Sequence, residues 1–151
     1  MLKSQNPNYK DYVRLKIDRN KFMQEIGFQI NEIQEGAVTG ELVVAEMHEQ
    51  QNGFVHGGVI STMCDMACGF AAYSLVPEGV QVFTTEIKVS YLRPGIGQKI
   101  FAKGWVLKAG KMFHNCEAEL YAENNGEQKL IAKASSTMAV VDRKMNDKYG
   151  D

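Results

Sequence analysis

Asp65 is the one residue in the most apolar part of the sequence whose side chain could do acid–base or nucleophilic chemistry. The stretch HGGVISTMCDMACGFAAYSLV, residues 56–76, is almost entirely apolar or small, and Asp65 is its only formal charge. A carboxylate on such a helix can act as a general base or as a nucleophile. It can equally be a structural group that bonds to Ser61 or Thr62 one turn away. Residue types alone leave both interpretations open.

The residues His56, Gly57 and Gly58 open the same stretch and add a second chemical feature. Glycines at a helix start leave backbone N–H groups without bulky side chains over them. The helix dipole favours negative charge at that end, so an oxyanion that forms from a carbonyl would be stabilised there. The alternative is that the two glycines only permit a sharp turn into the helix.

The spacing of these two features predicts how they can work together. Gly57 and Asp65 are eight residues apart, about 12 Å along a helix axis. A reacting carbonyl needs its oxyanion donor and its base or nucleophile within about 3 Å. Two antiparallel helices would bring Gly57 of one chain to Asp65 of another, which predicts a two-fold dimer with composite sites. The small residues that would permit this crossing are Ser61, Thr62, Cys68, Gly69 and Ala72.

The composition indicates one ordinary globular domain. The chain has 151 residues, of which 44% are apolar and 23% charged, and its formal net charge is −1. This balance gives no sign of a nucleic-acid partner or an anionic membrane. The opening stretch is nearly long enough to span a bilayer, but Asp65 makes a protein-buried helix the better interpretation.

The three cysteines, Cys64, Cys68 and Cys116, do not form a disulfide framework. Their odd number fits a reducing compartment, and the N-terminus has no apolar signal segment, so we expect a cytoplasmic protein. A zinc site would need further ligands at suitable spacing, and no histidine near in sequence would activate a thiol. We therefore expect buried apolar cysteines, no metal and no bound cofactor.

The pattern of apolar residues predicts an α+β fold, in which a long helix from about 57 to 75 is wrapped by a curled antiparallel sheet. A short helix is expected at 22–26, and two strands within 28–45. Four more strands in meander are expected within 80–94, 98–108, 112–123 and 128–141. Alternation would place residues 83, 85, 87, 89 and 91 on one face. We expect a loosely ordered segment at 1–18, the domain at 19–141 and a polar tail at 142–151.

The segment NGFVHGGVISTMCDMACG, residues 52–69, resembles the hotdog-fold acyl-CoA thioesterases, in particular the PaaI-like branch. The segments TTEIKVSYLRP and GKMFHNCEAELYAENNGEQKLIAKASSTM resemble later strands of the same family. The resemblance extends from about 22 to 141. It implies the hotdog fold, a homodimer that often pairs into a homotetramer, and hydrolysis of acyl-CoA without a cofactor.

The resemblance also implies roles for individual residues. Asp65 stands at the position of the catalytic carboxylate, and Gly57 at that of the N–H that polarises the thioester carbonyl. Gln50 matches an amide that holds substrate or water, with Asn52 as the alternative. Thr84 matches a hydroxyl that orients water, with Thr85 as the alternative. The expected substrate-binding residues are His56, Gly58, Asn52, Thr85, Phe54 and Lys111.

Two other functions remain open at this stage. A hotdog dehydratase or hydratase would need a histidine beside the carboxylate, which the helix does not offer in sequence. A non-catalytic acyl-CoA-binding module would use the same pocket without turnover. The cations that could meet CoA phosphates are Lys88, Arg93, Lys108 and Lys111. The residues expected to set the depth of the acyl pocket are Phe54, Phe70, Tyr73 and Phe83.

Overall fold

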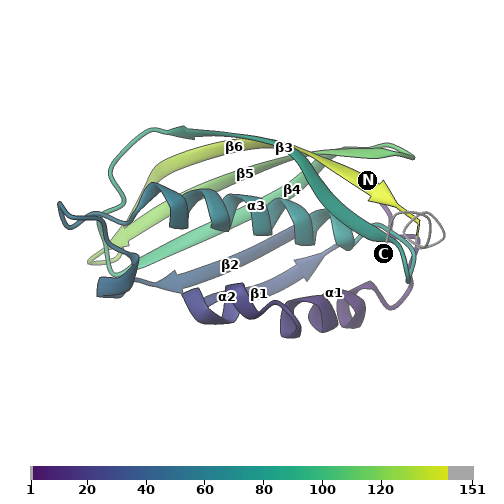
Figure 1. Cartoon of the computed structure of the whole chain (residues 1–151), viewed down its shortest axis with the longest axis horizontal. Helices are drawn as coiled ribbons and strands as arrows, with labels where there is room; N and C mark the ends of the chain where they lie inside the picture. Colours follow the sequence, from purple (N-terminus) through teal and green to yellow (C-terminus); the bar gives the residue numbers. More distant parts are fainter. Residues whose placement is uncertain (1, 143–151) are drawn as a thin grey trace, which may run out of the picture.

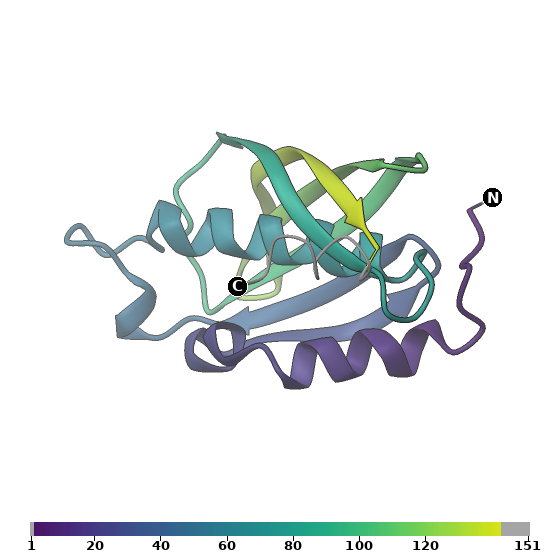
Figure 2. The same ribbon diagram turned by 45° about the vertical axis from the view of Figure 1, so that its right-hand side comes forward.

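The computed structural model describes residues 2–142, and its centre is the helix α3, Gly57–Tyr73. One six-stranded antiparallel sheet curls around this helix, as Figures 1 and 2 show from two directions. The strands are β1 Phe28–Gln34, β2 Ala37–Val43, β3 Gln81–Tyr91, β4 Lys99–Ala109, β5 Phe113–Asn124 and β6 Glu127–Val141. The α+β architecture expected from the sequence is therefore confirmed.

The strand order is β1-β2-β4-β5-β6-β3, so the predicted meander of four strands is correct only for β4, β5 and β6. β3 pairs with β6 at the far edge of the sheet. The path of the connection 92–98 explains why β3 does not lie next to β4. The N–H groups of Leu92 and Arg93 bond to the carbonyl of Ile131 on β6, and the N–H of Gln98 bonds to Glu123 on β5. The chain thus crosses the ends of two strands before β4 pairs with β2.

The expected unbroken alternation of β3 is also wrong, because the strand carries a bulge between Thr84 and Glu86. One extra residue on a strand reverses which side chains face the core. Before the bulge Val82 is buried and Phe83 is 49% exposed. After it Ile87 is partly buried and packs against the core.

The close packing of α3 on the sheet depends on Gly104 of β4. A Cβ atom at this position would lie 2.5 Å from the carbonyl group of Ala67. The faces of the helix expected to pack on the sheet are buried, including Ile60, Met63 and Ala71. Cys68 and Ala72, expected on the open face, are fully buried too. The sheet curls far enough to cover them.

The N-terminal segment differs from the expectation of loose order. It forms α1, Tyr9–Asp18, followed by α2, Lys21–Ile26. Val13 is fully buried, and the hydroxyl of Tyr12 donates to the carbonyl of Val80, 3.0 Å away. Burial of these residues against the domain stabilises a helix that polar composition alone did not indicate. The predicted tail lies outside the described residues except for Asp142.

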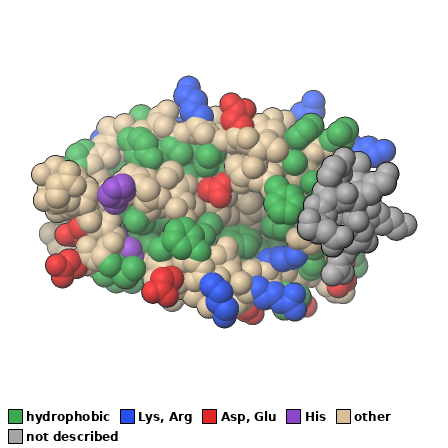
Figure 3. Space-filling model, viewed as in Figure 1, with side chains coloured by type: hydrophobic (Ala, Val, Ile, Leu, Met, Phe, Trp, Pro, Cys, Tyr) green, Lys and Arg blue, Asp and Glu red, His purple; other side chains and the backbone are tan. Residues whose placement is uncertain are grey.

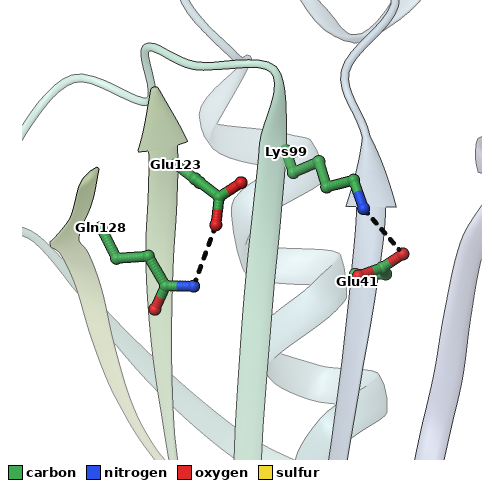
Figure 4. Close-up of polar contacts among 4 residues, drawn as sticks. All are labelled: Glu41, Lys99, Glu123 and Gln128. Carbon is green, nitrogen blue, oxygen red and sulfur yellow. Dashed lines mark hydrogen bonds and ion pairs between the residues drawn. The ribbon is translucent and has the colours of Figure 1, made fainter. Parts of the chain in front are cut away.

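Polar contacts on the sheet fix neighbouring strands in register. Lys99 of β4 forms an ion pair with Glu41 of β2 at 3.2 Å, and Gln128 of β6 donates to Glu123 of β5 at 3.2 Å (Figure 4). Cross-strand pairs of this kind each contribute a few tenths of a kcal/mol to about 1 kcal/mol.

Across residues 2–142, every helix is too short or too polar to cross a lipid bilayer.

We expect Gly104→Ala to lower the free energy of unfolding by about 2 kcal/mol, because the added methyl group would overlap Ala67 of α3. Urea unfolding followed by circular dichroism measures this change. The control is Lys103→Ala, at the exposed position next along β4, which should alter stability by no more than about 0.5 kcal/mol. Equal stability of the two variants would contradict the proposed close contact.

Candidate active site

Asp65 and Thr84 meet on the open side of α3. The hydroxyl of Thr84 donates a hydrogen bond to Oδ1 of Asp65, 2.6 Å away, while Sδ of Met138 lies 3.3 Å from the same hydroxyl. Thr84 precedes the bulge of β3 and lies on the same face of the strand as the buried Val82, toward the helix. Asp65 is partly exposed, so its carboxylate can reach a molecule on this face. Figure 3 shows apolar side chains on this face around an acidic group near its centre.

The first turn of α3 has one N–H group that is not used within the fold. Nδ1 of His56 accepts from the N–H of Gly58 at 2.8 Å, and the carbonyl of His56 accepts from Val59 and Ile60. Within residues 2–142, no group accepts a hydrogen bond from the N–H of Gly57. His56 therefore caps the helix and leaves the Gly57 donor for a ligand.

Tyr91, at the end of β3, holds Gly57 in place. Its hydroxyl donates to the carbonyl of Gly57 at 3.0 Å. A Cβ atom at Gly57 would lie 3.3 Å from the ring, so only glycine fits here without a shift. Alternation in the sequence placed Tyr91 on one face of the predicted strand and gave it no role in the site. The aromatic residue just before Leu92-Arg93-Pro94 was the available signal.

The Gly57 donor borders a pocket of about 340 Å³, which we call the glycine pocket. Its lining consists of Gln50, Phe54, Val55, Gly57, Ile60, Tyr91, Leu92, Arg93, Pro94 and Gly95. Gln50 and Phe54 thus lie on the wall of the pocket that Gly57 borders. Asn52, the alternative amide, lies outside this lining, and its N–H donates to Oε1 of Gln50 at 2.8 Å. This geometry favours Gln50 over Asn52 as the amide that faces a ligand.

The structure does not bring every expected site residue together. Asp65 is absent from the lining of the glycine pocket and lies beside Thr84 instead. Thr85 bonds instead to the carbonyl of Thr137, at 3.0 Å. Lys111 lies in the turn between β4 and β5, outside that lining.

Of the aromatic residues expected to set the depth of the acyl pocket, only Phe54 borders the glycine pocket. Phe70 belongs to the buried core, and Phe83 is 49% exposed. Tyr73 donates to Oε1 of Gln81 at 3.2 Å.

The three histidines lie in other places than beside the carboxylate of Asp65. Nε2 of His48 lies 2.8 Å from the carbonyl of Ile26, and His56 caps α3. His114 is buried on β5, where desolvation lowers the pKa of its imidazole. Within the part of the chain that the structure describes, Asp65 is therefore hydrogen-bonded to Thr84 and not to a histidine.

Known proteins resemble both the sequence and the fold of this chain. The Thioesterase superfamily matches residues 52–129, more than half of the sequence. The chain belongs to this superfamily. The medium/long-chain acyl-CoA thioesterase YigI of Escherichia coli K12 is 31% identical over 99 residues, which cover 57% of this chain and 62% of YigI. The match thus spans less than two thirds of that relative.

Solved structures confirm the hotdog fold of this superfamily member. A thioesterase family protein from Silicibacter pomeroyi has 34% identity and a TM-score of 0.87, covering 89% of this chain and 98% of that one. The Escherichia coli PaaI protein has 19% identity and a TM-score of 0.80, covering 88% of this chain and 93% of that one. The resemblance to the PaaI-like thioesterases inferred from residues 52–69 is confirmed.

The cysteines of this superfamily member are all buried and free. Burial raises the pKa of Cys64 and of Cys116 to about 12 and raises that of Cys68 further. Since the thiolate is the nucleophilic form, none of these residues is suited to attack a thioester at neutral pH.

We expect no cysteine to react with a thiol reagent such as dithionitrobenzoate at pH 7.5 in the native protein. Burial raises each thiol pKa, so the thiolate fraction stays negligible until the pH approaches the raised values. All three thiols should react after unfolding in guanidinium, which serves as the control. Rapid reaction of one thiol in the native protein would contradict this assignment.

Proposed function

We propose that this protein hydrolyses acyl-CoA thioesters to a carboxylic acid and CoA. The observation that carries the proposal is the unused N–H of Gly57 at the positive end of α3, on the wall of the glycine pocket. A thioester carbonyl is the kind of group that such a donor would polarise. Membership of the Thioesterase superfamily and the likeness to YigI support the same substrate class.

In the proposed reaction, the Gly57 N–H donates a hydrogen bond to the thioester oxygen as negative charge grows on that oxygen. A single donor of this type typically contributes 10²–10³-fold to the rate, or about 3–4 kcal/mol. Tyr91 fixes the carbonyl of Gly57, and His56 occupies the next N–H, so the donor is held before substrate binds. Little reorganisation is then needed in the transition state.

Asp65 supplies the second chemical function, as a general base toward water or as a nucleophile. The hydrogen bond from Thr84 orients its carboxylate and leaves the second oxygen available. Gln50, on the wall of the glycine pocket, would hold the substrate or the attacking water. Water is the only co-substrate, and the proposed chemistry requires no metal or cofactor.

The Gly57 donor and the Asp65 carboxylate would come together in a homodimer. β3 pairs with β6 along one side only and forms an edge of the sheet. Long edge strands are commonly covered by pairing. A two-fold partner that continues the sheet at β3 would place its α3 antiparallel to this one. Asp65 and Thr84 of the partner chain would then approach the Gly57 donor.

The alternatives use the same pocket in other ways. A dehydratase or hydratase would need a histidine and a carboxylate as an acid–base pair, yet Asp65 bonds to Thr84. A binding module without turnover would keep the pocket and need no carboxylate. Release of free thiol from a panel of acyl-CoA esters separates hydrolysis from both alternatives.

We expect Asp65→Asn to lower kcat/KM for the best acyl-CoA by about 10³-fold or more, because the amide can neither accept a proton nor attack. Free-thiol release measures the rate, and light scattering verifies that the assembly is unchanged. Near-normal turnover by this variant would refute the role of Asp65.

We expect Thr84→Val to lower the same rate by about 30-fold, because a hydrogen bond to a charged group contributes about 2 kcal/mol. Thr84→Ser is the matched control, since it keeps the hydroxyl and should retain most activity. Equal losses in the two variants would show that the bond to Asp65 has no part in turnover.

Mixed dimers test whether the site is shared. Asp65→Ala subunits lack the carboxylate, and Gly57→Val subunits displace the donor because the side chain meets Tyr91. In a composite arrangement, one site of the heterodimer carries both substitutions and the other carries neither. Co-refolded mixtures should then regain about half the activity of a wild-type dimer per heterodimer. No recovery, with heterodimers verified by mass spectrometry, would exclude the shared site.

A further inference from the structure

The segment 45–56, which joins β2 to α3, carries two histidines, and we propose that their neutral imidazoles make one wall of the glycine pocket sensitive to acid. The segment includes the 3₁₀ helix η1, Glu46–His48, and ends at His56, the residue before α3. It brings Gln50 and Phe54 to the glycine pocket. It projects beyond the sheet at the start of α3 (Figures 1 and 2). The inference rests on the proposed function, because it describes how pH regulates the same site.

His48 has one protonation state that fits its surroundings. The backbone N–H of Ala45 donates to Nδ1 at 2.9 Å, so Nδ1 presents a lone pair and carries no proton. Nε2 lies 2.8 Å from the carbonyl of Ile26 and therefore carries the proton that this carbonyl accepts. The side chain is 4% exposed, so water does not readily replace these partners. A second proton, on Nδ1, would point at the Ala45 N–H and break that bond.

His56 has the same requirement at the start of α3. Its Nδ1 accepts from the N–H of Gly58 at 2.8 Å, so the imidazole is the N-cap of the helix. An imidazolium donates from both nitrogens and cannot accept this bond. Its positive charge would also lie at the positive end of the helix dipole. Protonation thus removes the cap from the turn that presents the Gly57 donor.

The two imidazoles act on one piece of backbone. The N–H of His56 donates to the carbonyl of His48 at 2.7 Å. The bond from His48 to Ile26 attaches η1 to α2, and the N–H of Val55 donates to the carbonyl of Gly95 at 2.9 Å. Apart from His48 and Val55, the segment is exposed or half-buried. Its position therefore depends on few contacts, and the imidazoles supply three of its hydrogen bonds.

Charged neighbours do not change the direction of this effect. The elements packed against the two imidazoles carry further titratable or charged groups, namely Glu25, Glu41, Lys99, Glu49, Tyr91 and Arg93. Carboxylates attract a proton to an imidazole and cations oppose it, but neither restores an acceptor for the Ala45 or Gly58 N–H. The loosened segment therefore binds more protons than the closed one, and the closed form loses stability as pH falls. We expect the loss where imidazoles usually change charge, between about pH 5 and 8.

Histidine NMR and hydrogen exchange test the inference without a substrate. In protein labelled with nitrogen-15 histidine, His48 and His56 should both carry their proton on Nε2 at pH 8. At pH 5.5 the amides of Val55, His56 and Gly58 should lose protection by about fivefold or more, after correction for the intrinsic pH dependence of exchange, because a helix cap typically contributes a factor of this size. The amides of β5 and β6 should keep their protection and serve as the internal control.

The informative variant is His48→Gln/His56→Asn. The Asn amide oxygen can cap α3 and the Gln amide can bond to Ile26, and neither side chain titrates. Protection of the segment should then change by less than about twofold between pH 8 and pH 5.5. His114→Gln replaces the third histidine, which is buried on β5, and as the matched control it should keep the wild-type pH dependence. If the double substitution does not fold, His56→Asn alone should remove the acid response of the Gly58 amide.

Turnover gives the second readout. Free-thiol release from an acyl-CoA, relative to each protein's own rate at pH 8, should fall at pH 5.5 about fivefold further in the wild type than in the double variant. Three outcomes would overturn the inference: a proton on Nδ1 of either residue at pH 8, protonation of both imidazoles without loss of protection, or equal acid responses of the wild type and the double variant. If no ester is hydrolysed at any pH, the proposed function fails, and the exchange measurement still decides the acid response.

Discussion

The contact between Ala67 of α3 and Gly104 of β4 is the constraint on which the rest of the structure depends. It lets an apolar helix lie against the sheet at a separation that any side chain at position 104 would increase. The sheet then curls until only one strip of the helix remains open. Both polar features of the site belong to this helix, the Gly57 donor at its start and Asp65 two turns later. Packing of the core therefore sets the positions of both groups.

A buried helix creates a particular demand at its first turn. Its early N–H groups have no acceptor within the helix and need one from a cap, from water or from a ligand. His56 satisfies three of them through its side chain and carbonyl, while Gly57 is left unpaired within the described chain. Gly57 is only partly buried, so this donor can exchange water for a ligand. The donor lies on the wall of a pocket, next to Tyr91, and in the proposed reaction it binds the anionic oxygen.

Much of this arrangement could be predicted from local sequence. The long helix, the paired strands and the open helix start at Gly57-Gly58 follow from periodicity and helix-end chemistry, which depend on neighbouring residues. The bond from the Gly58 N–H to His56 was not predicted. The place of β3 could not be predicted, because the connection 92–98 bonds to strands that come later in the chain. The bulge after Thr84, which places Ile87 and Val89 against the core, depends on pairing with β6. The formation of helix α1 depends on burial of Val13 against the rest of the fold.

The central claim is that Gly57 of one chain and Asp65 of its partner act on one carbonyl. The most direct measurement is a crystal structure with an acyl-CoA analogue in which a methylene group replaces the thioester sulfur. The account predicts the ketone oxygen about 3 Å from the Gly57 N–H. It also predicts the carboxylate of Asp65 from the second subunit on the opposite side of the same carbon. A ketone bound away from the start of α3, or beside the Asp65 of the same chain, would contradict it.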